Sequence, residues 1–166
     1  RPGNLQNVIS IDASSIESTE ILFGPGAVMY GSDAIGGVMD FHTLKPKITT
    51  DSAGKMSFTG SAMGRYSSAN TEKTGHLDFN IGLKKFAFLT SVTYSDYDDL
   101  RTGTYGNNYF LRPSYVETVD GKDSMFVNND STLQVGSGFS QLNLMQKILF
   151  QPNKNFEIEY AFHYSA

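Results

Sequence analysis

The fold class of this chain is decided by one alternating stretch, Phe156-Glu157-Ile158-Glu159-Tyr160-Ala161-Phe162-His163-Tyr164-Ser165. Every even position carries an aromatic or aliphatic side chain, and every odd position carries a polar or small one. Successive side chains of a β-strand point to opposite faces, so the stretch predicts a strand with one apolar and one polar face. Its length of roughly ten residues is also enough to cross a bilayer at a tilt.

The same alternation, in places weaker, recurs in four segments further towards the N-terminus. We predict strands over residues 55–66, 76–83, 86–97 and 138–150. Short connections at residues 84–85 and 151–155 alternate with longer ones at residues 67–74 and 98–137. A soluble sandwich has no reason to gather its short turns at one end, whereas an outer-membrane barrel has short periplasmic turns and long extracellular loops. The sequence therefore predicts a mainly β chain that is part of a large antiparallel transmembrane β-barrel.

Composition narrows the choice of function. The 166 residues are 39% hydrophobic and 18% charged, with 12 Phe, 9 Tyr and no Cys, which excludes a disulfide scaffold and a thiolate metal site. A net charge of -4 argues against a nucleic-acid partner. No apolar run is long enough for a transmembrane helix. No arrangement of Ser, His and Asp indicates catalysis, so we expect a protein that is not an enzyme.

On the polar faces of the predicted strands, six side chains would point into a barrel lumen: His76, Asp78, Asn80, Glu157, Glu159 and His163. A wet barrel wall that touches whatever fills the lumen accounts for most of such residues. A direct role in binding a substrate is the alternative.

A different pattern precedes Lys45-Pro46-Lys47. Glu20–Phe23 reads as a strand that Gly24-Pro25-Gly26 ends, and a short helical turn follows, for which Pro supplies a fixed φ. Tyr30-Gly31-Ser32 closes the turn, with Gly31 free to take a positive φ. Gly36 and Gly37 let the next backbone pass close to a neighbour, and a strand containing Val38, Met39 and Phe41 follows. The glycines lack the Gly-Lys-Ser/Thr ending of a phosphate-binding loop, so we interpret them as structural.

This segment resembles the late plug domain of TonB-dependent receptors, whose pattern is roughly I-E-x-I-E-V-L-[RK]-G-P-x-S-x-L-Y-G followed by G-S-x-A-x-G-G-V. The resemblance runs over about thirty residues in register from Ile16. It includes the residues that we take as the plug motif: Glu20, Gly24, Pro25, Tyr30, Gly31, Gly36 and Gly37. Position 23, usually Arg or Lys in the family, is Phe23 here, which puts the usual ion pair between plug and barrel in doubt at this site.

The resemblance implies residues 1–47 as the C-terminal part of an N-terminal α+β plug domain and residues 48–166 as the first barrel strands. It implies TonB-dependent transport of a scarce nutrient, such as a siderophore, another metal chelate or a vitamin, across the outer membrane of a Gram-negative bacterium. The implied partners are TonB, contacted outside this chain, outer-membrane lipid, a small-molecule substrate and, in some relatives, a surface lipoprotein. A signalling receptor of the same architecture and a surface β-sandwich adhesin are the alternatives. Five strands cannot close a plugged barrel, so we expect a portion of a longer protein.

The long loop carries the remaining candidates. A polar and aromatic group suits ligand contact, with a plain extracellular loop as the alternative: Tyr105, Asn107, Asn108, Tyr109 and Arg112. Carboxylates in and beside the loop, at positions 96, 98, 99, 120, 123 and 130, could hold calcium as in some related transporters. Their spacing is not that of an EF-hand, and a solvated loop is the simpler interpretation. No resident cofactor is otherwise expected.

Overall fold

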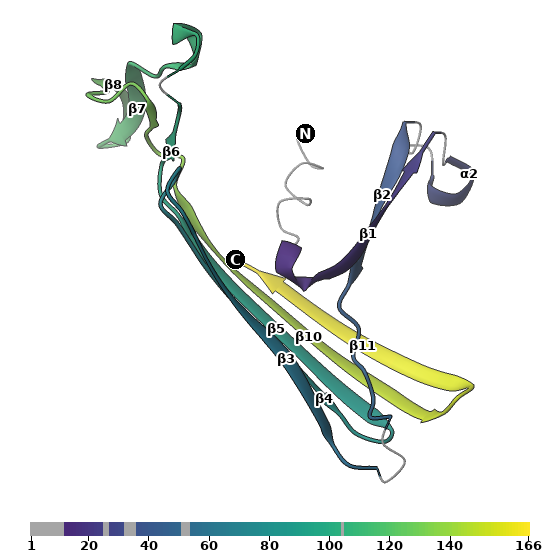
Figure 1. Ribbon diagram of the computed structural model, residues 1–166. Coiled ribbons are helices and arrows are strands. Elements are labelled where there is room, and N and C mark those ends of the chain that lie inside the picture. The colour runs from purple at the N-terminus through teal and green to yellow at the C-terminus, as the bar shows by residue number, and fades with distance from the viewer. Residues whose placement is uncertain (1–11, 25–26, 32–35, 51–53, 104) are drawn as a thin grey trace. The chain divides into compact units, whose positions relative to one another are not determined.

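The structure is a computed structural model that describes residues 12–24, 27–31, 36–50, 54–103 and 105–166 (Figure 1). The chain divides into two compact units, and the strands of its largest sheet run through both. One unit holds residues 1–62, 76–93 and 143–165, and the other holds residues 63–75 and 94–142 with Ala166. No helix in the described ranges is long and apolar enough to span a membrane.

The N-terminal segment is a β-hairpin that a short helix interrupts. The 3₁₀ turn η1 (Ala13–Ser15) leads into β1 (Ile16–Phe23), and helix α2 (Ala27–Tyr30) separates β1 from β2 (Gly37–Thr43). The carboxylate of Asp12 accepts a hydrogen bond from Ser14 N at 3.0 Å and so caps η1. β1 and β2 pair antiparallel from Ile16 opposite Thr43 to Phe23 opposite Gly37. The strand expected at Glu20–Phe23 therefore begins four residues earlier.

Two glycines of this segment have measurable reasons to be glycine. Gly31 ends α2 with φ at +96°, the left-handed conformation expected for it. Gly37 has φ at +149°, and a Cβ built there would lie 2.7 Å from the carbonyl oxygen of Leu22. The expected close approach is therefore made at Gly37, whereas the Cβ position of Gly36 has nothing within 4 Å. Pro25 lies outside the described residues.

The main sheet has five strands: β3 (Ser57–Ser67), β4 (Glu72–Gly82), β5 (Phe86–Tyr97), β10 (Phe139–Asn153) and β11 (Phe156–Ser165). Their order is β11-β10-β5-β4-β3, so each strand lies beside its predecessor in the sheet (Figure 1). The five predicted strands are all present, although β4 begins four residues before the predicted segment. The connection between β3 and β4 is correspondingly shorter than expected, with turn residues at 68–71.

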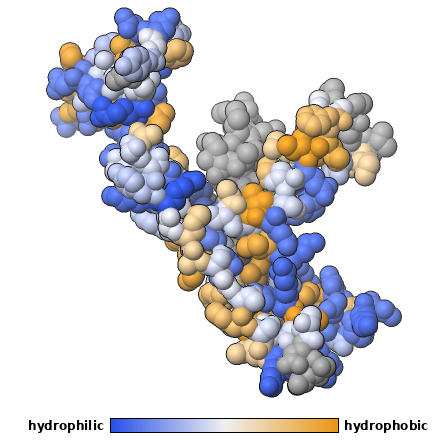
Figure 2. All heavy atoms as spheres, in the orientation of Figure 1, coloured by the Kyte–Doolittle hydropathy of each residue, from blue (hydrophilic) through white to orange (hydrophobic). Residues whose placement is uncertain are grey.

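The sheet has the reverse of a soluble protein's polarity. Most of its buried side chains are small or polar, with Ser91 1% exposed, Thr93 2% and Lys147 5%, although Leu89, Met145 and Leu149 are buried among them. The large apolar side chains lie open, with Leu77 at 51% and Ile158 at 53% exposure. Figure 2 shows such residues as orange surface along the strands. An exposed apolar face of this extent needs a non-aqueous partner.

Aromatic pairs reinforce this apolar face where strands meet. Phe58 of β3 stacks on Phe79 of β4 with ring centroids 6.2 Å apart, and Phe86 of β5 stacks on Phe150 of β10 at 4.6 Å. On the opposite, polar face, Tyr97 stacks on Phe139 at 4.6 Å. Stacked pairs of this kind contribute roughly 0.5–1.5 kcal/mol each beyond their buried area.

The segment expected to be one long loop contains structure of its own. It includes β6 (Leu100–Arg101), η2 (Asn108–Phe110), β7 (Ser114–Val119), β8 (Lys122–Val127) and β9 (Leu133–Gln134). β7 and β8 form a hairpin whose turn residues, Asp120 and Gly121, have φ of +51° and +75°. An Asp-Gly turn between two strands is a strong hairpin signal, and the interpretation as a plain loop missed it.

The prediction from the sequence that the apolar face contacts lipid can be tested by replacing one apolar side chain with a charged one. Phe162→Lys on the apolar face of β11 should weaken folding of the intact outer-membrane protein into lipid vesicles by about 2–4 kcal/mol, because lysine near mid-bilayer is costly. The matched control is His163→Lys, one residue along on the polar face, which should cost far less. Equal losses for both variants, in equilibrium unfolding measured by gel shift, would contradict the prediction.

Candidate functional site

A chain of hydrogen bonds crosses the polar face of the sheet and reaches the N-terminal segment. The hydroxyl of Ser61 on β3 donates to the carboxylate of Asp78 on β4, and Asp78 Oδ2 lies 3.2 Å from His76 Nε2. On the other side of the ring, His76 Nδ1 lies 2.7 Å from Thr93 Oγ1 on β5. The Thr93 hydroxyl in turn donates to Asp12 Oδ2 at 2.7 Å. Three strands are thus tied to the residue that caps η1.

The ring at the centre of this chain is enclosed. The His76 side chain is 4% exposed and that of Asp78 17%. Alternation along β4 and β5 puts His76 and Thr93 on the same polar face, which is why two residues 17 positions apart can share a hydrogen bond. Burying such polar groups is tolerable only when they are hydrogen-bonded, as they are here.

A second contact with the N-terminal segment is made by Asn80, which lies on the same polar face of β4 as His76 and Asp78. We call it the Lys47 anchor. The side chain of Asn80 accepts from the backbone N–H of Lys47 at 2.9 Å and donates to the carbonyl of the same residue at 2.9 Å. The backbone there passes so close to β4 that a Cβ on Gly82 would lie 2.5 Å from Lys47 O. Pro46 is buried beside it. The segment between the hairpin and β3 is therefore held on the sheet by backbone recognition.

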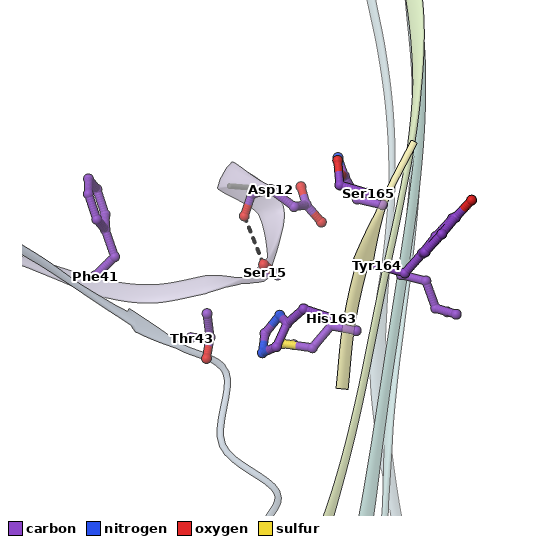
Figure 3. Close-up of a pocket in the computed structure, with 10 residues that line it drawn as sticks. Asp12, Ser15, Phe41, Thr43, His163, Tyr164 and Ser165 are labelled. Atoms are coloured by element: carbon purple, nitrogen blue, oxygen red, sulfur yellow. Dashed lines mark hydrogen bonds between the residues drawn. The ribbon is translucent and has the colours of Figure 1, made fainter. Parts of the chain in front are cut away.

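A cavity of about 390 Å³ lies where η1 and β2 face the ends of β10 and β11 (Figure 3). Asp12, Ser15, Phe41 and Thr43 line it from the N-terminal segment, with His163 opposite on β11. The Ser15 hydroxyl donates to the carbonyl of Asp12 at 2.8 Å, which holds the turn closed beside the cavity (Figure 3). Its lining combines a carboxylate, hydroxyls, an imidazole and an aromatic ring.

The six residues predicted to face a lumen lie on one face of the sheet but not in one cluster. His76 and Asp78 belong to the chain of hydrogen bonds, and Asn80 forms the Lys47 anchor. Glu159 lies 3.1 Å from Lys147, whose side chain is 6% exposed, and Glu157 accepts a hydrogen bond from Gln151 at 3.2 Å. His163 lies at the cavity of Figure 3. Their position inside a closed barrel stays a prediction.

The loop candidates separate. Tyr105, Asn107 and Asn108 line a cavity of about 340 Å³, whereas Tyr109 and Arg112 do not. Asn107 also has a structural role, because its side chain accepts from Tyr109 N at 3.0 Å and caps η2. The guanidinium of Arg112 turns to backbone carbonyls, at 3.4 Å from Leu111 O. A ligand role for these residues stays a prediction.

The loop carboxylates have protein partners. Asp99 Oδ1 accepts from Ser137 N and Gly138 N at 2.9 Å each, and Asp123 accepts from Thr118 at 2.7 Å. Asp130 accepts from Thr132, through its hydroxyl at 2.6 Å and its N–H, and from Arg101. These bonds, with that of the Thr132 hydroxyl first, lower the pKa of Asp130 from 3.8 to about 2. Within the described ranges, no three or more His, Cys, Asp or Glu side chains are grouped to hold a metal ion.

The plug motif residues that the structure describes are spread along the hairpin. Glu20 lies opposite Asp40, and His42 Nε2 lies 3.8 Å from Glu20 and 3.5 Å from Asp40. Phe23 is 91% exposed. The side chain at position 23, which is usually Arg or Lys in the family, is thus almost fully exposed here.

Sequence reasoning missed the residues that complete the chain of hydrogen bonds, Asp12, Thr93 and Ser61, and the partner of Asn80, Lys47. Alternation along β5 could have placed Thr93 on the polar face, and a polar residue before a helical turn could have marked Asp12 as a cap. Nothing in the sequence indicated that the two would meet. A second polar group was missed as well, in which Glu72 accepts from Arg65 Nε at 2.8 Å and from Thr74 at 2.8 Å.

Comparison with known proteins identifies the N-terminal segment. Residues 2–38 match the family model of the TonB-dependent receptor plug domain. The chain is 30% identical over 129 residues to the iron-regulated outer membrane virulence protein of two strains of Vibrio cholerae serotype O1. The match covers 76% of this chain and 18% of those relatives, so the chain spans about a fifth of their length. No solved structure matches the chain.

These matches confirm two predictions made from the sequence. The resemblance to TonB-dependent receptors is supported by the plug match, which covers the motif from Ile16 to Gly37. Location in the outer membrane of a Gram-negative bacterium is supported by the relatives, which are outer-membrane proteins. The plug match also supports the expectation that the protein is not an enzyme, because receptors with this domain are transporters.

The Lys47 anchor predicts a protease phenotype. Asn80→Ala in the intact receptor leaves the backbone N–H and carbonyl of Lys47 without these partners, at a cost of about 1–3 kcal/mol. Trypsin should then cleave after Lys47 roughly tenfold faster or more, because the segment leaves the sheet more often. Asn80→Asp keeps an acceptor for the N–H but loses the donor, so an intermediate rate is expected. Unchanged cleavage in both variants would exclude the anchor.

The Asp130 bonds predict loss of loop order in acid. The folded-state pKa is lowered, so the stability that the carboxylate contributes is present above its ordinary value of 3.8 and is lost as the pH falls through about 2. Pepsin, which is active in this range, should cleave residues 98–137 increasingly as the pH is lowered from about 4 to 2. Asp130→Asn should already be cleaved faster at the upper end. Asp120→Asn at the hairpin turn is the control and should behave as the unmodified protein does.

Proposed function

We propose that this chain, whose residues 2–38 match the plug domain of TonB-dependent receptors, is part of an outer-membrane importer of a scarce nutrient. The plug match is the observation that carries the proposal. Residues 1–47 would be the C-terminal part of the plug, and residues 48–166 the first strands of the barrel that surrounds it. The long segment at residues 98–137 would then be an extracellular loop.

The polarity of the sheet supports a barrel wall. Lipid outside a barrel requires an apolar outer face, and the plug and water inside it require a polar inner one. On β4 the apolar Leu77 is 51% exposed, whereas the polar His76 beside it is 7% exposed, as such a wall requires. Backbone groups at the outer edges of β3 and β11 need further strands, because unpaired N–H and C=O groups in lipid cost several kcal/mol each.

For the substrate, we propose an iron chelate. The relatives from Vibrio cholerae are named as iron-regulated, and a protein made in response to iron supply is suited to acquiring it. Tyr105, Asn107 and Asn108, which line the loop cavity, are candidates for the first contact with such a ligand. Uptake against a gradient would draw on TonB, which is contacted outside this chain.

Energised uptake tests the proposal directly. A strain that lacks the gene should lose accumulation of one radiolabelled ferric chelate from a panel of catecholate, hydroxamate and carboxylate types. The intact gene should restore accumulation only when TonB is present. A cobalamin in the same panel tests the vitamin alternative. Normal accumulation of every compound in the deletion strain would exclude import of these nutrients.

A further inference from the structure

Because position 23 is Phe, the plug segment must be held to the sheet of the barrel wall by other contacts. The side chain is 91% exposed and cannot form the ion pair that a basic residue would form there. The Lys47–Glu17 pair is no substitute, because its atoms are 3.8 Å apart and the lysine is 74% exposed. Exposed pairs of this kind contribute little. The Asp12–Thr93 bond, at 2.7 Å, joins a charged acceptor of the plug segment to a strand of the sheet.

The directions of these hydrogen bonds determine the protonation of His76. An ionised Asp12 can only accept, so the Thr93 hydroxyl must donate to it. With its one proton used, Thr93 Oγ1 can only accept from His76 Nδ1, which therefore carries a proton. His76 Nε2 faces an ionised Asp78, which also only accepts, so Nε2 must carry a proton too. The full chain of bonds therefore requires an imidazolium.

A neutral His76 satisfies only part of the chain. If its one proton lies on Nε2, the ring donates to Asp78, and its bare Nδ1 takes the hydroxyl proton of Thr93. The bond to Asp12 is then lost. If the proton lies on Nδ1, the bond to Asp12 survives, but two acceptors face each other at 3.2 Å between Nε2 and Asp78. The second proton of His76 thus decides whether the Asp12–Thr93 bond can form without repulsion between Nε2 and Asp78.

Carboxylates lie on both sides of the ring. Asp78 on β4 lies beside Nε2, and Asp12 on the plug segment accepts from Thr93, which lies beside Nδ1. Ser61 on β3 supplies a neutral hydroxyl. On the same sheet, the ammonium group of Lys147 lies 3.1 Å from Glu159.

We propose that Asp12, Thr93 and His76 form a proton-dependent latch between plug and wall, in the place of the family's usual ion pair at position 23. Removing a proton from His76 either releases Asp12, and with it the start of β1, or leaves two acceptors facing each other at Nε2 and Asp78. The inference rests on the proposed function for its meaning, since release of the plug segment would be a step in opening the import path. The latch itself can be measured without substrate or TonB.

Hydrogen exchange of the β1 amides in the intact receptor is the test. Thr93→Val removes the hydroxyl and keeps the side-chain shape, so exchange of β1 should accelerate about tenfold or more, as loss of a hydrogen bond to a charged group implies. Thr90→Val is the matched control, with the same substitution on the opposite face of β5, where Thr90 bonds Gln146 at 2.6 Å. Exchange of β1 should not change in this control.

Two further arms separate a latch from a merely structural contact. Asp12→Ala removes the acceptor, and combined with Thr93→Val it should cost less than the sum of the two single changes, because both break the same bond. In the unmodified receptor, β1 protection corrected for intrinsic exchange should fall as the pH rises from about 5 to 8, the range in which His residues lose their charge. His76→Gln should remove that dependence.

The outcomes are distinct. Additive effects of Asp12→Ala and Thr93→Val, or a pH dependence unchanged in His76→Gln, would overturn the latch. Iron-chelate uptake that does not depend on the gene, with the exchange results as expected, would reject the proposed import function and leave the latch standing. Faster passive entry of a hydrophilic dye into cells that carry Thr93→Val and lack TonB would link the latch to opening of the path.

Discussion

The placement of polar and apolar side chains on opposite faces of one sheet is the constraint on which the rest of this structure depends. In a soluble protein the apolar face would be buried. Here polar side chains such as Ser91, Thr93 and Lys147 are enclosed beside a few apolar ones, and Leu77 and Ile158 are open. Strand alternation fixes this arrangement, since a shift of one residue would reverse every side chain. The inverted polarity leaves an inner face on which polar networks can form.

Those networks determine how the N-terminal segment meets the sheet. Asn80 binds backbone groups of Lys47, which any residue at position 47 except proline would offer in full. The Asp12–Thr93–His76 chain of hydrogen bonds instead joins side chains, and in the proposed latch it can be released. One contact therefore places the connecting segment permanently, whereas the other can be released. A plug that must move during transport would need both kinds of contact.

The loop shows what its carboxylates do within the protein. Calcium binding was one interpretation of the clustered Asp residues and a solvated loop the simpler one; Asp99 and Asp130 are hydrogen-bonded to backbone N–H groups of the loop, and Asp130 also to Arg101. Protein N–H groups thus interact with these carboxylates, as a bound cation would. Asp120 in the same segment has a different role. It forms the Asp-Gly turn of the β7–β8 hairpin, in which both residues have positive φ. Local turn chemistry thus outweighed the composition of the segment.

The sequence by itself determined the five strands, which side chains share each face, the helical turn before Gly31 and the plug motif. These follow from local periodicity and from residue-specific backbone freedom, so they can be predicted without knowing any long-range contact. The tertiary structure alone decided that Asp12 meets Thr93, 81 positions away, that Asn80 holds Lys47, and that Phe23 contacts almost nothing. Such meetings depend on how the plug segment and its connection lie across the sheet, and no period in the sequence records that path.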